Sequence, residues 1–240
     1  MNEEFDRPAE AGVRLNKWIA ESGFCSRREA DRLITEGKVT IDGRVGVLGD
    51  KVLPGMKVRV DGRDAVVKKK KVYIMLNKPA GIVCTADPRE PMNVVDYVGH
   101  PERIFPIGRL DKDSEGLLLM TNDGEIVNRI LRAAGGHEKE YVVTVNKIIT
   151  DDFLKQMAEG VPILDTVTLP CRIIKEDKQR FRIILVQGLN RQIRRMCEAL
   201  GYRVTHLTRE RVMNIRLGHL KPGHWRNLTP AELDALMAQL

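Results

Sequence analysis

The spacing of apolar residues predicts two short helices near the start of the chain. Leu15, Trp18 and Ile19 fall at i, i+3 and i+4, the spacing of a short amphipathic helix. Ser26 and Glu29 form a capping-box pattern, so we expect a second helix to begin there. A glycine follows each predicted helix and would end it.

Short strands are predicted directly after these helices. Residues 39–41 and 58–60 alternate apolar and polar side chains, and each segment is followed by an Asp-Gly pair, Asp42–Gly43 and Asp61–Gly62. Asp-Gly pairs favour the tight turns that join neighbouring antiparallel strands. We therefore expect the two helices and these strands to form one small module.

The apolar runs after residue 71 predict a larger domain. We expect strands at 72–76, 82–84, 104–107, 117–120, 141–145, 166–174 and 180–186, and helices at 125–131, 150–159, 193–200 and from Thr229–Pro230 onward. Helices and strands do not alternate regularly, which predicts an α+β domain on a mixed, mostly antiparallel sheet.

Charge divides the chain at a run of four lysines, Lys68 to Lys71. Residues 14–71 hold 15 Lys and Arg against 8 Asp and Glu, a surplus equal to the net charge of +7 of the whole chain. A small basic module favours a polyanion partner, although a merely solvated basic surface fits the charge equally well. We expect a disordered leader over 1–12, the module over 13–67, a basic linker over 68–71 and the second domain over 72–240.

Several classes of protein are disfavoured by what the sequence lacks. No apolar run approaches the roughly 20 residues that cross a bilayer, and the acidic N-terminus does not resemble a signal peptide. The four cysteines are far apart, as expected for reduced thiols in a cytoplasmic protein rather than for a metal site. No Gly-rich nucleotide-binding pattern is present, so we expect neither a metal nor a cofactor.

A glycine-bracketed loop over residues 108–116 carries the first candidate for chemistry. The apolar run that follows it predicts a buried strand, which would anchor Asp111 on a rigid scaffold. Taken alone, an Asp in such a loop more often caps a turn.

Two further segments carry candidate side chains. Tyr141 begins a predicted strand after a charged loop, where its ring could equally well belong to the core. In the helix near residue 193, Arg191, Arg194 and Arg195 are predicted on the side opposite the apolar stripe. Three like charges on one face favour a bound anion, with scattered surface ion pairs as the alternative.

These three segments together resemble the pseudouridine synthases that modify ribosomal RNA, of the RsuA, RluB and RluF type, over roughly residues 13–230. The resemblance rests on Gly108-Arg109-Leu110-Asp111-Lys112-Asp113-Ser114, His137-Glu138-Lys139-Glu140-Tyr141 and Gly188-Leu189-Asn190-Arg191-Gln192-Ile193-Arg194-Arg195. The first module is similar to the alpha-L RNA-binding fold through Arg14-Leu15-Asn16-Lys17, Ser26-Arg27-Arg28-Glu29-Ala30 and Gly37-Lys38-Val39.

The resemblance implies a role for each candidate residue. Asp111 would be the catalytic carboxylate, Tyr141 would stack on the target uracil and Arg194 would hold Asp111 ionised. Arg109 would fill the space left by a flipped uridine, with Leu110 and Ile193 as pocket walls. RNA contacts would come from Arg14, Lys17, Arg27, Arg28, Lys38, Lys78, Arg191 and Arg195.

The reaction implied is the isomerisation of a uridine to pseudouridine in large-subunit ribosomal RNA, by a monomer in the cytoplasm. The features look most like the RluF-type enzymes. Three questions stay open on the sequence: whether the substrate is instead small-subunit RNA or a tRNA, whether Asp113 replaces Asp111, and whether the acid attacks the base, attacks the sugar or assists a glycal route. A non-catalytic RNA-binding or ribosome-assembly protein is the alternative from another class.

Overall fold

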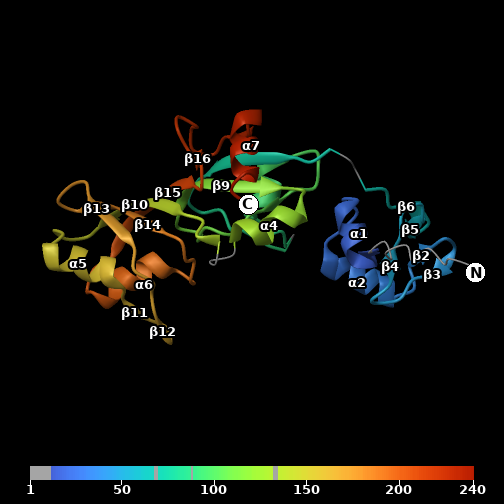
Figure 1. Cartoon of the computed structure of the whole chain (residues 1–240), viewed down its shortest axis with the longest axis horizontal. Coiled ribbons are helices and arrows are strands. Elements are labelled where there is room, and N and C mark those ends of the chain that lie inside the picture. Colours follow the sequence, from blue (N-terminus) through green and yellow to red (C-terminus); the bar gives the residue numbers. More distant parts are fainter. Residues whose placement is uncertain (1–11, 68–69, 88, 132–134) are drawn as a thin grey trace, which may run out of the picture. The chain divides into compact units, whose positions relative to one another are not determined.

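The computed structural model describes residues 12–67, 70–87, 89–131 and 135–240 (Figure 1). It divides into two compact units, Met1–Lys71 and Val72–Leu240. Most of the expected leader and half of the expected basic linker lie outside the described residues.

The first unit combines two helices with a small sheet. The helices are α1 (Leu15–Glu21) and α2 (Arg27–Thr35), and the strands are β1 (Val13–Arg14), β2 (Val39–Ile41), β3 (Arg44–Val45), β4 (Lys51–Val52), β5 (Val58–Val60) and β6 (Arg63–Asp64). Strands β3, β2, β5 and β6 pair in that order, and β1 pairs with β4. The Ser26 hydroxyl accepts the Glu29 N–H at 3.2 Å, so the predicted helix start is confirmed.

Both predicted Asp-Gly turns are present. Asp42 and Gly43 have φ values of 48° and 85°, and Asp61 and Gly62 have 48° and 76°. Two successive positive φ values match the tight turns whose twist suits an antiparallel hairpin. The hairpins then place Val39, Ile41, Val58 and Val60 in one core with Leu15 and Ile19 of the first helix.

Among the described residues, nine strands of the second unit form one sheet. They are β7 (Tyr73–Lys78), β8 (Phe105–Pro106), β9 (Glu115–Thr121), β10 (Lys139–Val145), β13 (Arg172–Lys175), β14 (Arg180–Leu185), β15 (Val204–Val212), β16 (Ile215–Arg216) and β17 (Trp225–Asn227). Their order is β13-β14-β10-β15-β9-β7-β17, with β8 beside β9 and β16 beside β15. Strands β9 and β15 pair in parallel and the neighbouring pairs run antiparallel, so the mixed, mostly antiparallel sheet is confirmed.

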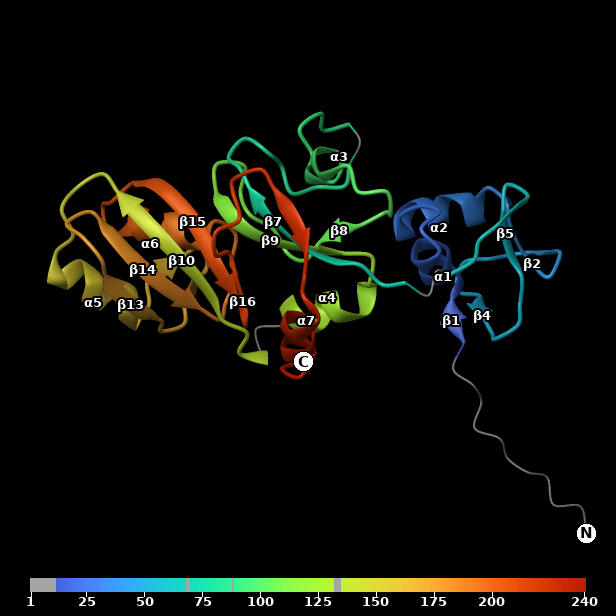
Figure 2. The same cartoon turned by 90° about the horizontal axis from the view of Figure 1, so that it is seen from above.

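Strand β9 is buried on both of its faces, which explains its unbroken apolar run. Leu118 and Met120 face a core shared with α3 (Val94–Val98), whereas Leu117 and Leu119 face a second core. That second core includes α4 (Gly124–Leu131) and α7 (Pro230–Met237). Figure 2 shows this half of the unit from above.

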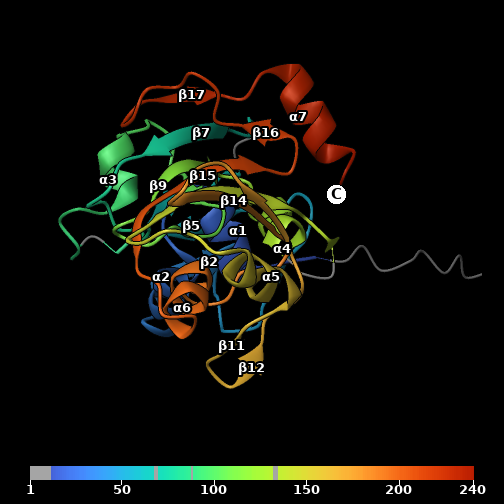
Figure 3. The same ribbon diagram turned by 90° about the vertical axis from the view of Figure 1, so that its left-hand side faces the viewer.

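The other half of the sheet is covered on one side by two helices. The helices α5 (Asp151–Glu159) and α6 (Gln192–Ala199) lie on the same side of β14 (Figure 3). Phe153 and Met157 of α5 and Met196 of α6 share a core with Phe181 and Ile183 of β14. A short hairpin of β11 (Pro162–Ile163) and β12 (Thr166–Val167) follows α5.

Two predicted strands were wrong or incomplete, and one central strand was missed. Residues 82–84 do not form a returning strand, since Val83 makes a single bridge to Asn93. The strand expected over 166–174 is divided, because Pro170 cannot donate to a ladder. Strand β15 was not predicted, because its charged residues hide the apolar pattern although two of its arginines are buried.

Candidate active site

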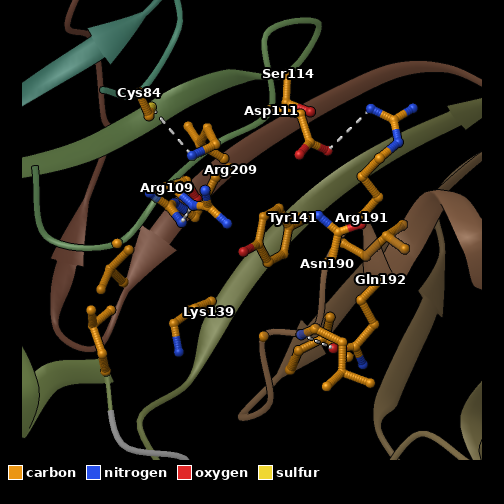
Figure 4. A pocket seen from close by; sticks show the side chains of 18 of the residues that line it. Cys84, Arg109, Asp111, Ser114, Lys139, Tyr141, Asn190, Arg191, Gln192 and Arg209 are labelled. Carbon is orange, nitrogen blue, oxygen red and sulfur yellow. Dashed lines mark hydrogen bonds and ion pairs between the residues drawn. The ribbon is translucent and has the colours of Figure 1, made fainter. Parts of the chain in front are cut away.

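A pocket of about 890 Å³ lies in the second unit where β9 and β15 run parallel (Figure 4). This size is within the roughly 300–1,000 Å³ of sites that enclose a small ligand. The lining includes half of the site residues expected from the sequence, which are Arg109, Leu110, Asp111, Tyr141, Arg191, Ile193 and Arg194. These side chains come from three segments far apart in the chain.

The loop that carries Asp111 is held from inside by Lys78. Lys78 is fully buried, and its Nζ donates to the carbonyl oxygens of Pro79 at 2.9 Å, Lys112 at 3.3 Å and Ser114 at 2.7 Å. Burial lowers the pKa of Lys78 below its usual value. The expected RNA contact by Lys78 is therefore wrong, because its ammonium group is occupied within the protein.

Two more contacts fix the ends of this loop. The Leu110 N–H donates to Cys84 Sγ at 3.3 Å, and burial raises the pKa of that thiol. At the other end Gly116 has φ 99°, and a Cβ there would lie 2.3 Å from the Arg209 carbonyl oxygen. Glycine is required at this position because β9 and β15 approach each other so closely.

Asp111 faces two guanidinium groups. Its Oδ2 is 3.7 Å from Arg191 Nη1 and 3.9 Å from Arg194 Nε, and its side chain is 29% exposed. Both distances exceed a normal hydrogen bond, so the interaction in this state is Coulombic. The carboxylate therefore lies in a locally positive part of the pocket.

Arg194 binds the loop more directly than it binds the carboxylate. Its Nη2 donates to the Asp113 carbonyl at 3.1 Å and to Ser114 Oγ at 3.3 Å, while its buried Nε has no hydrogen-bond partner among the described residues. Arg194 therefore ties α6 to the loop that presents Asp111.

The three arginines of this segment do not share one helical face as predicted. Arg191 precedes α6 in a left-handed conformation with φ 50°, Arg194 is buried, and Arg195 is half-buried. Arg195 donates to Asn190 O at 3.1 Å and does not line the pocket. A period of 100° per residue does not apply to Arg191, because the helix begins after it.

Tyr141 lies on β10 and is partly buried between the two halves of the domain. Its cross-strand neighbour is Arg209, whose Cζ is 6.0 Å from the ring centroid. Arg209 and Lys139 also line the pocket, although neither was predicted from the sequence as a site residue. The position of Lys139 could have been predicted, because residues two apart on a strand share a face and Lys139 lies two residues before Tyr141. The position of Arg209 could not, because strand β15 was not predicted from the sequence.

The RNA contacts expected in the first unit come from basic side chains of β1, α1, α2 and the segment before β2. Arg27 and Arg28 are exposed at the start of α2, and Arg14 is exposed in β1. Lys17 lies 3.5 Å from Glu21, and Lys38 lies 2.8 Å from Glu36.

Two other properties of the described part of the chain bear on function. It contains no helix long and apolar enough to cross a membrane. It also contains no group of three or more His, Cys, Asp or Glu side chains arranged to hold a metal ion.

A small unit of helices and short strands, followed by a mixed sheet with a carboxylate pocket, matches the arrangement expected of an RNA-modifying enzyme. The family model for RNA pseudouridylate synthase matches residues 72–199, and the model for the S4 domain matches 13–61. The chain belongs to the RNA pseudouridylate synthase family, with an S4 domain as its first unit.

Individual relatives agree with this assignment. The chain is 56% identical to the dual-specificity RNA pseudouridine synthase RluF of Salmonella typhi, over 93% of this chain and 78% of that protein. It is 38% identical to the ribosomal large subunit pseudouridine synthase B of Bacillus subtilis, over 94% and 96%. A crystal structure of a pseudouridylate synthase superposes with a TM-score of 0.69 at 28% identity, covering 93% of this chain and 99% of that one.

Proposed function

We propose that this RNA pseudouridine synthase isomerises a specific uridine of large-subunit ribosomal RNA, with Asp111 as the catalytic carboxylate. The observation that carries the proposal is the position of Asp111, within 4 Å of two guanidinium groups in a pocket shared with Tyr141. The Bacillus subtilis relative, which is named for the large ribosomal subunit, supports the choice of substrate.

The reaction separates uracil from C1′ of the ribose at N1 and joins it again through C5. It involves no net oxidation or hydrolysis. The target uridine must first leave its stack, at a cost of a few kcal/mol. In this proposal Arg109 occupies the vacated space, Leu110 and Ile193 form walls around the base, and Tyr141 stacks on it.

Asp111 then assists the departure of the base. An ionised carboxylate suits this role whether it bonds to C1′, bonds to C6 or stabilises charge on the sugar. Arg194 places a positive charge beside the carboxylate and keeps its loop in place. Arg191 contacts the RNA backbone at the mouth of the site, and Arg195 contacts it outside the pocket.

RNA affinity comes mainly from the S4 domain in this proposal. Arg14, Lys17, Arg27, Arg28 and Lys38 supply phosphate contacts, which position RNA without reading its sequence. The wild-type chain should therefore bind RNA with a strong salt dependence.

The test uses the purified full chain with fragments of large-subunit ribosomal RNA and maps pseudouridine at single-nucleotide resolution. We expect one or a few sites in wild type, none with Asp111→Asn, and an RNA Kd within a few fold of wild type. Asp113→Asn is the matched control and should stay active, because the Asp113 carbonyl, rather than its carboxylate, binds Arg194. Loss of activity in Asp113→Asn together with full activity in Asp111→Asn would reverse the assignment.

Parallel reactions with small-subunit RNA and tRNA test the substrate. The Salmonella typhi relative is described as dual-specificity, so a second RNA class is included. Modification confined to small-subunit RNA or tRNA would overturn the proposed substrate while leaving the reaction intact.

A further inference from the structure

The ladder between β10 and β15 contains a bulge at the pocket. Glu140 is opposite Arg211, but Tyr141 is opposite Arg209, so Glu210 is the extra residue. In an unbroken ladder Glu210 would stand opposite Tyr141. The bulge therefore replaces an acid with a base at the cross-strand neighbour of Tyr141, and bulges commonly re-aim side chains beside active sites.

The displaced acid is neutralised elsewhere. Glu210 Oε2 accepts from Arg182 Nη1 at 2.7 Å, and its side chain is 42% exposed. Arg211 donates to Glu140 at 2.7 Å and to Glu138 at 2.7 Å. These pairs account for the charges next to the bulge, and no carboxylate of the described residues is left to pair with Arg209.

Arg209 is fixed in place with one nitrogen unused. Its side chain is buried, with the residue only 3% exposed. Nε donates to the Leu117 carbonyl at 2.7 Å and Nη1 to the Arg109 carbonyl at 3.4 Å. Nη2 is buried and has no hydrogen-bond partner among the described residues. A buried, unpaired N–H of a charged group is costly, which favours an acceptor supplied by a ligand.

A second cation shares this part of the pocket. Lys139 lies two residues before Tyr141 on β10, is 8% exposed, and lines the same pocket. Its Nζ donates to the His137 carbonyl at 3.3 Å, a long bond. Burial, together with the nearby charge of Arg209, lowers the pKa of Lys139. Within the described residues, no carboxylate forms an ion pair with Lys139 or Arg209.

These two cations are more deeply buried than the groups around Asp111. Arg191 and Asp111 have side chains 40% and 29% exposed, whereas Arg209 and Lys139 are almost fully buried. In the view of Figure 4, Arg209 and Lys139 appear on one side of Tyr141 and Arg191 on the other. A backbone phosphate stays near the mouth of a pocket, while a flipped base enters it, so the buried cations match the base.

We propose that Arg209 and Lys139 form a subsite that binds the carbonyl oxygens of the target uracil and stabilises the negative charge of the detached base. The proposal rests on the proposed function. When the C1′–N1 bond breaks, its electron pair stays on uracil and is shared among N1, O2, O4 and C5. C5 then bonds to C1′, the proton on C5 leaves and N1 gains a proton, so atoms and electrons balance. Fixed cations in a dry site stabilise such developing charge strongly.

The experiment measures single-turnover rates and RNA Kd separately, for the full chain with an RNA that wild type modifies. We expect Arg209→Gln and Lys139→Met to lower the rate about 100-fold or more, as for removal of one oxyanion donor, with Kd within about 3-fold. Lys139→Arg should restore most of the rate. Arg211→Gln on the same strand is the matched structural control, and the folded enzyme should react within a few fold of wild type.

Two readouts distinguish contact with the base from a structural role. An RNA with 4-thiouridine at the target presents a weaker hydrogen-bond acceptor, so wild type should react with it more slowly than with uridine. The ratio of the two rates should be smaller in Arg209→Gln. In wild type the rate should fall as pH rises through the pKa of Lys139, because the cation is lost. Lys139→Arg should not show this fall, because arginine stays protonated.

The outcomes separate this proposal from the one it rests on. If wild type forms no pseudouridine, the proposed function fails. If wild type is active and the variants lose affinity and rate in parallel, the subsite binds phosphate and the inference is overturned. Rates near wild type, or an unchanged thio effect in Arg209→Gln, would also overturn it.

Discussion

Arg194 lies beside Asp111 without bonding to its carboxylate, since Nε and Oδ2 are 3.9 Å apart. The same Nε is buried and unpartnered within the described residues, while Nη2 holds the Asp113 carbonyl and Ser114 Oγ. Catalytic hydrogen bonds are often long before the substrate binds and shorten in the reactive complex. A small movement of the loop would satisfy Nε and tighten the pair.

Substitution of Arg194 should therefore affect the reaction more than binding. We expect Arg194→Leu to lower the single-turnover rate of pseudouridine formation at least about 100-fold, because Asp111 loses a partner and its loop loses an anchor. The RNA Kd should change only a few fold. Filter binding gives the RNA Kd, and single-turnover assays on the same preparations give the rate.

Arg191→Leu is the matched comparison. Arg191 is nearly as close to Asp111, at 3.7 Å, but its side chain is 40% exposed. We expect its loss to weaken RNA binding several fold and to slow the reaction less than Arg194→Leu does. Equal losses of rate and affinity in Arg194→Leu would identify it as an ordinary phosphate contact.

Lys78 should contribute to stability rather than to RNA binding. Lys78→Met leaves three carbonyl oxygens without their buried donor, so we expect a loss of about 2–4 kcal/mol in the free energy of unfolding. Urea unfolding followed by circular dichroism measures it. Lys112→Met, an exposed lysine in the same loop, should change stability by less than about 0.5 kcal/mol. An RNA Kd that weakens in folded Lys78→Met would contradict this assignment.

Local signals in the sequence were sufficient for much of the fold. The Ser26 cap, the Asp-Gly turns and the apolar run before Thr121 each depend on a few neighbouring residues, and each is present as predicted. The mixed sheet was predicted from the order of these helices and strands along the chain. Strand β15 did not, because its central position between β9 and β10 buries arginines that a sequence pattern treats as exposed.

The site was predictable where a short motif carried it and not where tertiary pairing did. Asp111, Tyr141 and Arg194 belong to three recognisable segments, and all three line one pocket. Arg209 reaches the same pocket through a bulge, a register shift that no local pattern encodes. Lys78 was misassigned because a lysine in a turn is usually exposed, whereas here three carbonyl oxygens enclose its ammonium group.

The S4 domain should supply much of the salt dependence of RNA binding. Arg27 and Arg28 are exposed at the start of α2. If both contact phosphates, Arg27→Gln with Arg28→Gln should flatten the plot of log K against log salt by about 1–2 units, through fewer released counterions. Binding measured from 50 to 300 mM salt, roughly the range over which such slopes are resolved, gives this slope.

Arg32 provides the control on the same helix. Its guanidinium is already paired with Glu29 and Glu36. Arg32→Gln makes the same change in charge per residue but should leave the slope nearly unchanged. If Arg32→Gln flattens the slope as much as either Arg27→Gln or Arg28→Gln, net charge rather than contact determines affinity.

An ion pair at the start of α7 should make the stability of the second unit depend on pH. Glu232 accepts two hydrogen bonds from Arg226, both at 2.7 Å, and completes a capping box with Thr229. Arg226 is the main reason that the pKa of Glu232 is lowered to about 2. A carboxyl with a depressed folded pKa stabilises the protein above its unfolded value of about 4.3, and this contribution is lost as pH falls towards the folded value.

We therefore expect Glu232→Gln to lower the free energy of unfolding by about 1 kcal/mol at pH 7, a modest value because the pair is partly exposed. The deficit should shrink between about pH 4 and pH 2, where wild-type Glu232 becomes protonated. Thr229→Ala removes the cap but keeps the ion pair, so its deficit should stay nearly constant over that range. Urea unfolding of both variants at several pH values tests this, and a Glu232→Gln deficit that is constant with pH would show that the ion pair does not stabilise α7.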